Sequence, residues 1–286
     1  MKLQTPVTFP ASRITVTPED RVMVIGSCFA DQIGAKLLHA GFQACVNPFG
    51  TLYNPISVAN ALSRLSDGRH FTVSECVEMG AGAGLVCSFS HHTSFARPTA
   101  EEFLAAANQS LEEASAFWQD CNKVILTLGT IFCFVREGGV VSNCLKRPAA
   151  EFERFEMSLD QVLAVLRKAV IASPGKEFIF TVSPIRHLSD GAHMNQISKS
   201  TLLLGLDELQ RDPRVGQRCE YFPAYEIVLD ELRDYRFYAE DMVHPTAQAA
   251  DYIWERFQDF AVPASDRPRI AEAEKAWRAS QHRKMH

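Results

Sequence analysis

The sequence lacks any apolar run long enough to cross a membrane, although 47% of its 286 residues are hydrophobic. The longest apolar candidate, residues 124–135, stops at Arg136 and is shorter than the ~18 residues that a membrane helix needs. Residues 1–13 hold a lysine with no apolar core behind it, so we expect no secretory signal. These absences predict a globular, cytoplasmic protein with no membrane span.

An excess of positive charge is also missing. The chain carries 29 Lys and Arg against 34 Asp and Glu, a formal net charge of −5. A general nucleic-acid binder presents a basic surface, so we expect no nucleic-acid partner. A chain of this length can bury roughly 75% of the surface that its unfolded form exposes, so its fold needs no disulfide or metal.

None of the eight cysteines forms a Cys-x-x-Cys pair, which argues against a zinc ribbon or a redox dithiol. No cluster of His, Cys and Asp has the spacing of metal ligands, so we predict no metal and no other cofactor. We interpret the cysteines as small buried hydrophobic residues in a reducing cytoplasm. Their even count also permits disulfides.

Short apolar strands alternate with amphipathic helices along the chain. We predict strands at residues 21–25, 123–128 and 177–182, and helices at 28–38, from Asn54-Pro55 onward, at 101–118, 159–171, 197–209 and 246–260. Strands that alternate with helices are typical of the α/β class, with a parallel sheet covered on both faces.

Three other segments have their own character. Gly138-Gly139 predicts a hairpin between two short β-branched runs, and the glycine-broken stretch 71–89 is strand-like. The last twenty residues are basic and weakly amphipathic. We therefore divide the chain into a domain at residues 1–262 and a basic C-terminal helix or tail at residues 263–286.

In an open α/β sheet, ligands bind outside the carboxyl ends of the strands. The polar residues that follow the predicted strands are therefore the candidate site. They are Gly26-Ser27-Cys28, Gly129-Thr130, residues 183–187 and, ahead of the last predicted helix, residues 241–245.

Ser27 lies between a strand and a helix, where backbone N–H groups are unpaired and can stabilise an oxyanion. A serine needs a neighbouring base to act as a nucleophile, and the alternative role for Ser27 is a helix cap. Cys28 is the other possible nucleophile. We expect its side chain on the packed face of the helix, which would leave Ser27 facing the crevice.

Asp241 and His244 supply the base that such a nucleophile needs. The Asp-x-x-His spacing in a tight loop can bring the carboxylate to one ring nitrogen while the other points outward. Pro245 favours an extended backbone at His244. The alternative is a turn with a surface histidine.

Residues 26–30 spell GSCFA, and the chain resembles the GSCFA family, a branch of the SGNH (GDSL-like) hydrolases, over about residues 22–260. Four more stretches carry the resemblance: NPFGTLYNP at 47–55, LTLGT at 126–130, SPIRHLSDG at 183–191 and DMVHPT at 241–246. The resemblance implies a three-layer α/β/α sandwich, similar to flavodoxin, with a short parallel sheet of about five strands. It also implies Ser27 as nucleophile, His244 as general base and Asp241 as the carboxylate that orients it.

The same resemblance implies an oxyanion hole with three donors: the N–H of the nucleophile, a glycine N–H that maps onto Gly50, and a side chain that maps onto Thr130. The broader superfamily has Asn at the position of Thr130, whose hydroxyl can donate one hydrogen bond. Asn47 and Asn54 are alternatives for the third donor, and the sequence does not choose between them.

Arg186 and His187 follow a predicted strand, so they can line the pocket and contact a polar or anionic acyl substrate. The alternative is structural, with Arg186 in an ion pair and His187 bonded to backbone. The resulting hypothesis is a serine esterase or acyl hydrolase, or an acyltransferase, that removes small O-acyl groups such as acetyl from carbohydrate through an acyl-serine intermediate. The competing hypotheses are a non-catalytic carbohydrate-binding protein and a scaffold that uses the C-terminal segment. The oligomeric state is left open.

Overall fold

The structure is a computed structural model that describes residues 5–284. In chain order its strands are β1 Arg21–Gly26, β2 Gln43–Val46, β3 Val77–Glu78, β4 Val86–Cys87, β5 Lys123–Leu128, β6 Phe132–Arg136, β7 Gly139–Val141, β8 Glu153–Glu156, β9 Glu177–Val182 and β10 Cys219–Tyr221. Its α-helices are α1 Cys28–His39, α2 Pro55–Asp67, α3 Ala100–Asp120, α4 Leu159–Ile171, α5 Gly191–Arg211, α6 Ala224–Glu226, α7 Ala247–Ala261 and α8 Arg267–Lys284.

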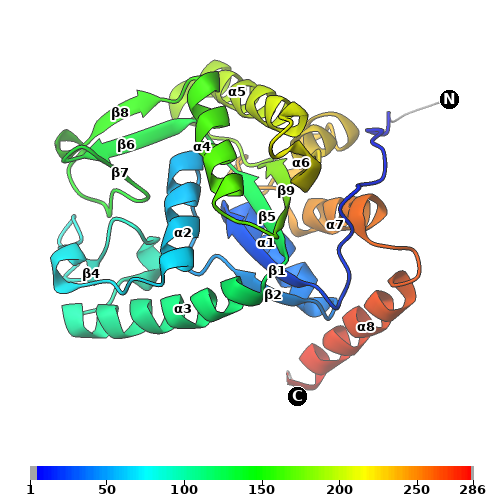
Figure 1. Cartoon of the computed structure of the whole chain (residues 1–286), viewed down its shortest axis with the longest axis horizontal. Coiled ribbons are helices and arrows are strands. Elements are labelled where there is room, and N and C mark those ends of the chain that lie inside the picture. Colours follow the sequence, from blue (N-terminus) through cyan, green and yellow to red (C-terminus); the bar gives the residue numbers. More distant parts are fainter. Residues whose placement is uncertain (1–4, 285–286) are drawn as a thin grey trace.

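The central sheet has five strands in the order β10-β9-β5-β1-β2, and every neighbouring pair is parallel. Figure 1 shows these strands side by side, with helices in front of and behind them. The predicted α/β class and the three-layer α/β/α sandwich are confirmed.

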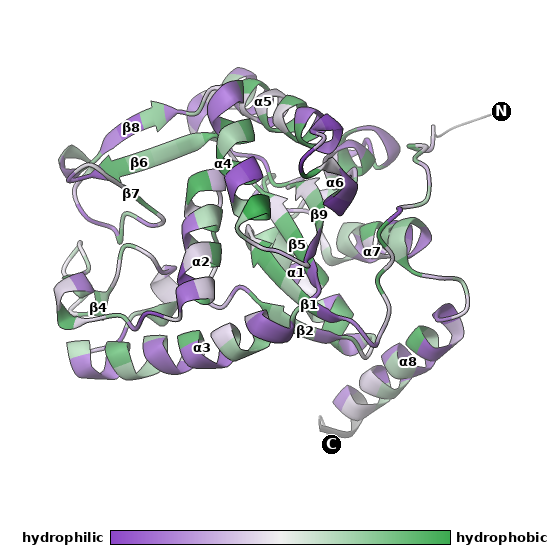
Figure 2. Ribbon diagram, in the orientation of Figure 1, coloured by the Kyte–Doolittle hydropathy of each residue, from purple (hydrophilic) through white to green (hydrophobic). Residues whose placement is uncertain are grey.

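Alternate residues of β1 belong to opposite faces of the sheet, as the pleat requires. Met23 and Ile25 pack in a core with α2, α3, α4 and α5. Val22 and Val24 pack in a second core with α1 and α7. The central strands are accordingly hydrophobic in Figure 2. These buried strands are a rigid base for the loops at their carboxyl ends.

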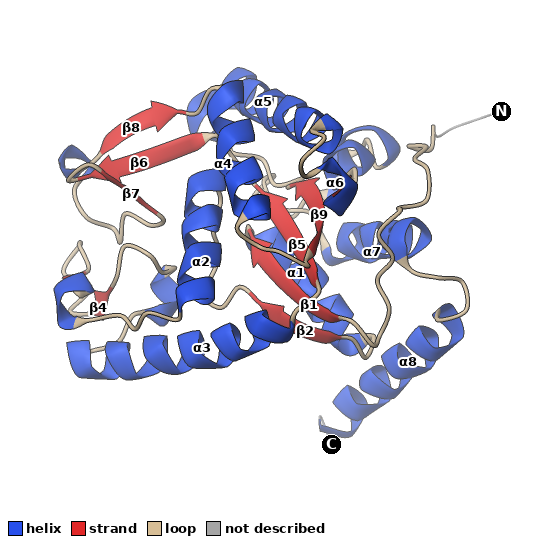
Figure 3. Ribbon diagram, in the orientation of Figure 1, coloured by secondary structure: helices blue, strands red, loops and turns tan. Residues whose placement is uncertain are grey.

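A smaller antiparallel sheet, β7-β6-β8, lies beyond α2 from the central sheet (Figure 3). Its β6–β7 hairpin turns at the predicted Gly138, whose φ is +78°. The strand-like stretch 71–89 forms a second small antiparallel pair, β3 with β4, and a short 3-10 helix at Val73–Glu75. The loop that follows β7 continues toward the end of the central sheet that carries the candidate site.

The sequence missed the edges of the central sheet. β2 and β10 contain only four and three residues, too short to stand out by periodicity. The helix predicted from residue 197 begins at Gly191, six residues earlier. Asn54 caps α2 through its side chain, as expected, and the other long helices begin and end within two residues of the predicted bounds.

The order of the strands places a topological switch between β1 and β5, because the chain leaves β1 toward β2 and returns on the other side at β5. Gly26 ends β1 there. A Cβ atom at Gly26 would lie 2.2 Å from the carbonyl oxygen of Thr127, so no larger residue fits. Ligands bind at such switch points.

The C-terminal segment forms helix α8 over Arg267–Lys284, and the last two residues lie outside the described part of the chain. Ile270 of α8 is buried, and Trp277 stacks on His39 of α1 with ring centroids 3.5 Å apart. Among the described residues, none of the helices is both long and apolar enough to span a bilayer.

Candidate active site

A cleft of about 590 Å³ opens at the carboxyl ends of the central strands. Its lining comes from the start of α1, the start of α2, the loop after β5, the loop after β9 and the loop before α7, together with the small antiparallel sheet and the loop after β7. The polar lining side chains at the ends of the central strands are Cys28, Tyr53, Asn54, Thr130, Arg186, His187 and His244.

Asp241 holds His244 in one orientation. Its Oδ1 accepts the backbone N–H groups of Val243 and His244 at 2.8 and 3.0 Å, and its Oδ2 lies 2.6 Å from His244 Nδ1. The loop closes through Met242, whose φ is +57°. The N–H of His244, the N–H of Val243 and then the imidazole hold the pKa of Asp241 down at about 2. A carboxylate in this position orients the Nδ1–H tautomer, which leaves Nε2 free to accept a proton.

His244 Nε2 lies 3.3 Å from the Sγ atom of Cys28. Cys28 is the first residue of α1, and its half-buried side chain packs against the second core, as expected. It also lines the cleft, which the sequence did not lead us to expect. Phe29 packs fully in that core, with 0% exposure. Because successive helical residues point about 100° apart, Cys28 turns to the cleft when Phe29 turns to the core.

Ser27 does not face His244, which corrects the geometry expected for the serine nucleophile. The residue is 0% exposed, and its Oγ donates to Ser183 Oγ at 2.9 Å. The same Oγ accepts the N–H of Phe29 at 3.3 Å, so Ser27 is the N-cap of α1. The cap conformation turns its hydroxyl back toward the helix and the end of β9, away from the cleft.

The thiol of Cys28 is partly buried, and burial is the main cause that raises its pKa above the ordinary range. The negative charges of Asp31 and Asp241 raise it further, and the hydroxyl of Tyr53 partly offsets the rise. The raised pKa favours the neutral thiol over the thiolate, and His244 Nε2 lies beside its sulfur atom.

Two of the four expected oxyanion groups lie outside the cleft. The N–H of Gly50 donates to Asn47 O at 2.7 Å inside a tight turn, so it is not available to a substrate. The carboxamide of Asn47 accepts the N–H of Gly26 at 2.8 Å and donates to Asp31 at 2.5 Å. Asn47 therefore supports the end of β1, and neither Asn47 nor Gly50 lines the cavity.

Asn54 and Thr130 do line the cleft, but their polar atoms differ in availability. Asn54 Oδ1 accepts the N–H of Ser57 at 2.9 Å, and within residues 5–284 its Nδ2 donates to no protein group. Thr130 Oγ1 accepts the N–H of Phe132 and shares a 3.1 Å hydrogen bond with Ser198 Oγ. Of these two residues, Asn54 is therefore the one with a free side-chain donor at the cleft.

Arg186 and His187 line the cleft, as their place after a strand suggests. Arg186 Nη1 donates to Met242 O at 2.9 Å, and its guanidinium lies over the Tyr238 ring. The backbone N–H of His187 donates to Asn195 Oδ1. Burial, and then the nearby charge of Lys199, lowers the pKa of His187 to about 4, so this ring stays neutral near pH 7.

Lys199 lies fully buried beneath the cleft and was not among the residues predicted from the sequence. Its Nζ donates to Gly129 O at 2.7 Å and to Ser183 O at 2.8 Å, and so joins the ends of β5 and β9. Burial lowers its pKa to about 7. The available signal was a lysine inside the apolar stripe of α5, between Asn195 and Leu202, which are also buried. No group of three His, Cys, Asp or Glu side chains among the described residues could hold a metal ion.

The fold is of the α/β class, and Cys28, His244 and Asp241 form a polar site at the carboxyl ends of its parallel strands. The chain belongs to the GSCFA family, whose family model matches residues 21–257. This range covers the central sheet, the cleft and helix α7. No curated protein matches the chain in a sequence comparison.

Proposed function

We propose that this protein is an acyl hydrolase of the SGNH type that uses Cys28, in place of a serine, as its nucleophile. One observation carries the proposal: His244 Nε2 contacts Cys28 Sγ while Nδ1 is bonded to Asp241. A nucleophile, a base in reach of it and a third group that orients the base form the arrangement used in covalent acyl transfer.

The reaction has two balanced halves. Cys28 Sγ attacks the acyl carbonyl, its proton passes to His244 Nε2, and the C–O bond to the alcohol breaks as His244 returns that proton to the leaving oxygen. Water then attacks the thioester, gives its proton to His244, and releases the acid as the Cys28 thiol is restored. If a second alcohol replaces water, the same site acts as an acyltransferase.

The oxyanion that forms in each half needs preorganised donors. The backbone N–H of Cys28 has no partner within α1 because it belongs to the first turn. The Nδ2 group of Asn54 is the second proposed donor. Its capping bond to Ser57 fixes the carboxamide, so the donor is held in place before substrate arrives.

The proposed substrate is a small O-acyl group, such as acetyl, on a carbohydrate alcohol, as the resemblance to SGNH hydrolases implies. We propose the cytoplasm as its location. The eight free cysteines support this, because such cysteine usage is typical of a reducing compartment.

The test is hydrolysis of p-nitrophenyl esters of increasing chain length and of acetylated sugars. Cys28→Ala should lose at least three orders of magnitude in turnover. Cys144 lines the same cleft without touching His244, so Cys144→Ala is the matched control and should stay within a factor of three of wild type. Mass spectrometry of acid-quenched protein should find the acyl group on the peptide that carries Cys28.

Ser27→Ala separates the two adjacent residues. It removes a helix cap, so it should cost about 0.5–2 kcal/mol of unfolding free energy, with less than a tenfold loss of turnover. A Ser27→Ala protein without activity but with native stability, together with an active Cys28→Ala protein, would restore the serine nucleophile and reject the cysteine.

A further inference from the structure

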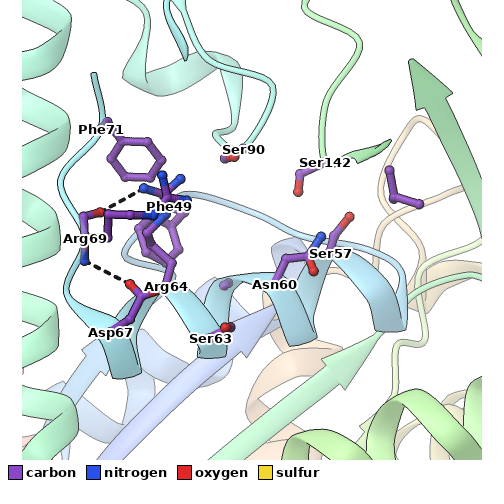
Figure 4. A pocket seen from close by; sticks show the side chains of 12 residues that line it. Phe49, Ser57, Asn60, Ser63, Arg64, Asp67, Arg69, Phe71, Ser90 and Ser142 are labelled. Atoms are coloured by element: carbon purple, nitrogen blue, oxygen red, sulfur yellow. Dashed lines mark hydrogen bonds between the residues drawn. The ribbon is translucent and has the colours of Figure 1, made fainter. Parts of the chain in front are cut away.

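A second cavity, of about 270 Å³, lies along helix α2 next to the cleft, and Ser142 lines both. In Figure 4, Ser57 and Asn60 rise from α2 toward Ser142, which points back at them from the loop after β7. No hydrogen bond joins these three side chains to one another among the described residues. They face the same space with their donors and acceptors unused.

Ser57 is the strongest evidence that this space takes a ligand. The residue is only 1% exposed, and its Oγ has no hydrogen-bond partner. A buried hydroxyl without a partner destabilises the fold, so proteins rarely retain one without a reason. A ligand hydroxyl in the cavity would supply the missing bond.

The rest of the lining says which kind of ligand fits. Its free neutral polar groups are hydroxyls and a carboxamide: Ser57, Asn60, Ser63, Ser90 and Ser142. The charged side chains in the wall are those of Arg64, Asp67 and Arg69. The exposed guanidinium of Arg69 has no partner among the described residues and lies at the other end of the cavity from Ser142 (Figure 4), whereas the other two are engaged. Arg64 pairs with Glu75 and donates to Arg69 O at 2.8 Å, and Asp67 accepts the backbone N–H of Arg69 at 2.9 Å.

Hydroxyls and carboxamides both donate and accept hydrogen bonds, which matches a ligand whose own groups do the same. An anionic ligand beside Ser57 and Ser142 would meet no uncommitted cation, because Arg69 lies at the other end of the cavity (Figure 4), and an apolar ligand would leave Ser57 unpaired. The lining therefore favours an uncharged polyhydroxyl compound, that is, a saccharide.

Helix α2 connects this cavity to the catalytic cleft. Asn54, at the N-cap of α2, lines the cleft, Ser57 follows one turn later and Asn60 nearly two turns later. At ~1.5 Å per residue, Asn54 and Asn60 are about 9 Å apart along the helix axis. A ligand that fills both cavities must therefore extend along α2 past Ser142.

We propose that the cavity lined by Ser57, Asn60 and Ser142 is a saccharide subsite that binds sugar units remote from the acyl group, so that the substrate is an acylated oligosaccharide. This inference rests on the proposed function and deepens it. It predicts that the protein prefers an acylated chain of sugars to an acylated single sugar.

The kinetic test compares two substrates in each variant: an acetylated xylotetraose and p-nitrophenyl acetate, which is too small to reach the second cavity. In Ser57→Ala and Asn60→Ala, the ratio of kcat/KM for the tetrasaccharide to kcat/KM for the small ester should fall at least tenfold, mainly through KM. Gln109→Ala, on the surface of α3, removes a carboxamide elsewhere and should leave the ratio unchanged. Ser57→Ala should not lower the melting temperature, because Oγ has no partner to lose. An unchanged ratio in both cavity variants would overturn the subsite.

A binding measurement keeps the two proposals separate. Calorimetric titration of Cys28→Ala with unacylated tetraoses of xylose, glucose and N-acetylglucosamine should detect binding of at least one, and adding Asn60→Ala should weaken it at least tenfold. Binding that depends on Asn60, in a protein that hydrolyses no ester, would uphold the subsite and reject the proposed reaction. Ester hydrolysis by wild type without binding of any saccharide would reject the subsite and uphold the proposed reaction.

Discussion

His244 Nε2 lies 3.3 Å from Cys28 Sγ, whereas the neighbouring Ser27 is buried against Ser183. The two adjacent residues therefore have different tasks: one caps helix α1 and the other meets the histidine. The contacts among Cys28, His244 and Asp241 join the end of β1 to the loop before α7.

The first prediction concerns the reactivity of Cys28 toward iodoacetamide. Only the thiolate reacts, and burial raises the pKa of Cys28, so its rate should keep rising with pH beyond the range where a free cysteine levels off. His244 can take the proton, so His244→Ala should slow the reaction at pH 7. The measurement is the alkylation rate of the Cys28 peptide by mass spectrometry between pH 6 and 10. A plateau below pH 8 would contradict the prediction.

The second prediction separates Asn54 from Thr130 as the oxyanion donor. Loss of one side-chain donor costs about 100- to 1,000-fold in turnover in other enzymes. Asn54→Asp keeps an N-cap oxygen for Ser57 but removes the Nδ2 donor, so we expect it to lose turnover in this range with α2 still capped. The Thr130 hydroxyl is engaged with Ser198 and Phe132, so Thr130→Val should lose less than tenfold. The measurement is the turnover of one ester by each variant in the steady state. A larger loss in Thr130→Val than in Asn54→Asp would identify Thr130 as the donor.

The third prediction concerns acid stability and His91. His91 is fully buried among aromatic rings, including Phe71 and Phe103, and burial lowers its pKa to about 3. In the unfolded chain the imidazole of His91 binds a proton near pH ~6.5, whereas in the folded chain it stays neutral there. The unfolded state therefore binds more protons, and the free energy of unfolding falls as pH drops through this range. The loss is on the order of 3 kcal/mol between pH 7 and pH 4.

His91→Phe removes this titration. Urea unfolding at pH 7, 5.5 and 4 should show a smaller acid loss for the variant than for wild type. Equal pH dependence in the two proteins would mean that His91 takes up its proton in the folded state.

The fourth prediction concerns Lys199. Its pKa is lowered to about 7 in the folded chain, against ~10.4 in an unfolded one, so the unfolded state binds more protons between these values and stability rises with pH. Between pH 6 and pH 8.5 this gain is about 2 kcal/mol. Lys199→Met should show a lower stability, because Gly129 O and Ser183 O lose their donor, and should lack this rise. The measurement is the free energy of unfolding of wild type and of Lys199→Met as a function of pH. Parallel pH dependence in the two proteins would contradict the prediction.

The sequence by itself determined the layers of this protein. Apolar runs such as EFIFTV at 177–182 form buried parallel strands because both faces of such a strand are covered, and the helices between them follow from their spacing. It also determined the Asp241–His244 pair, since an Asp-x-x-His loop brings both side chains together through three local hydrogen bonds. These relations lie within a few residues, where local geometry decides.

Only the tertiary structure decided which residue His244 meets, because that contact joins positions 216 residues apart. The rotation of α1 about its axis settles it, and this rotation is set by the burial of Phe29 together with the cap at Ser27. The same holds for Lys199, whose partners Gly129 and Ser183 directly follow two different strands, β5 and β9. Residues distant in sequence meet at the strand ends because packing of the whole sheet brings them there, and no local pattern encodes that packing.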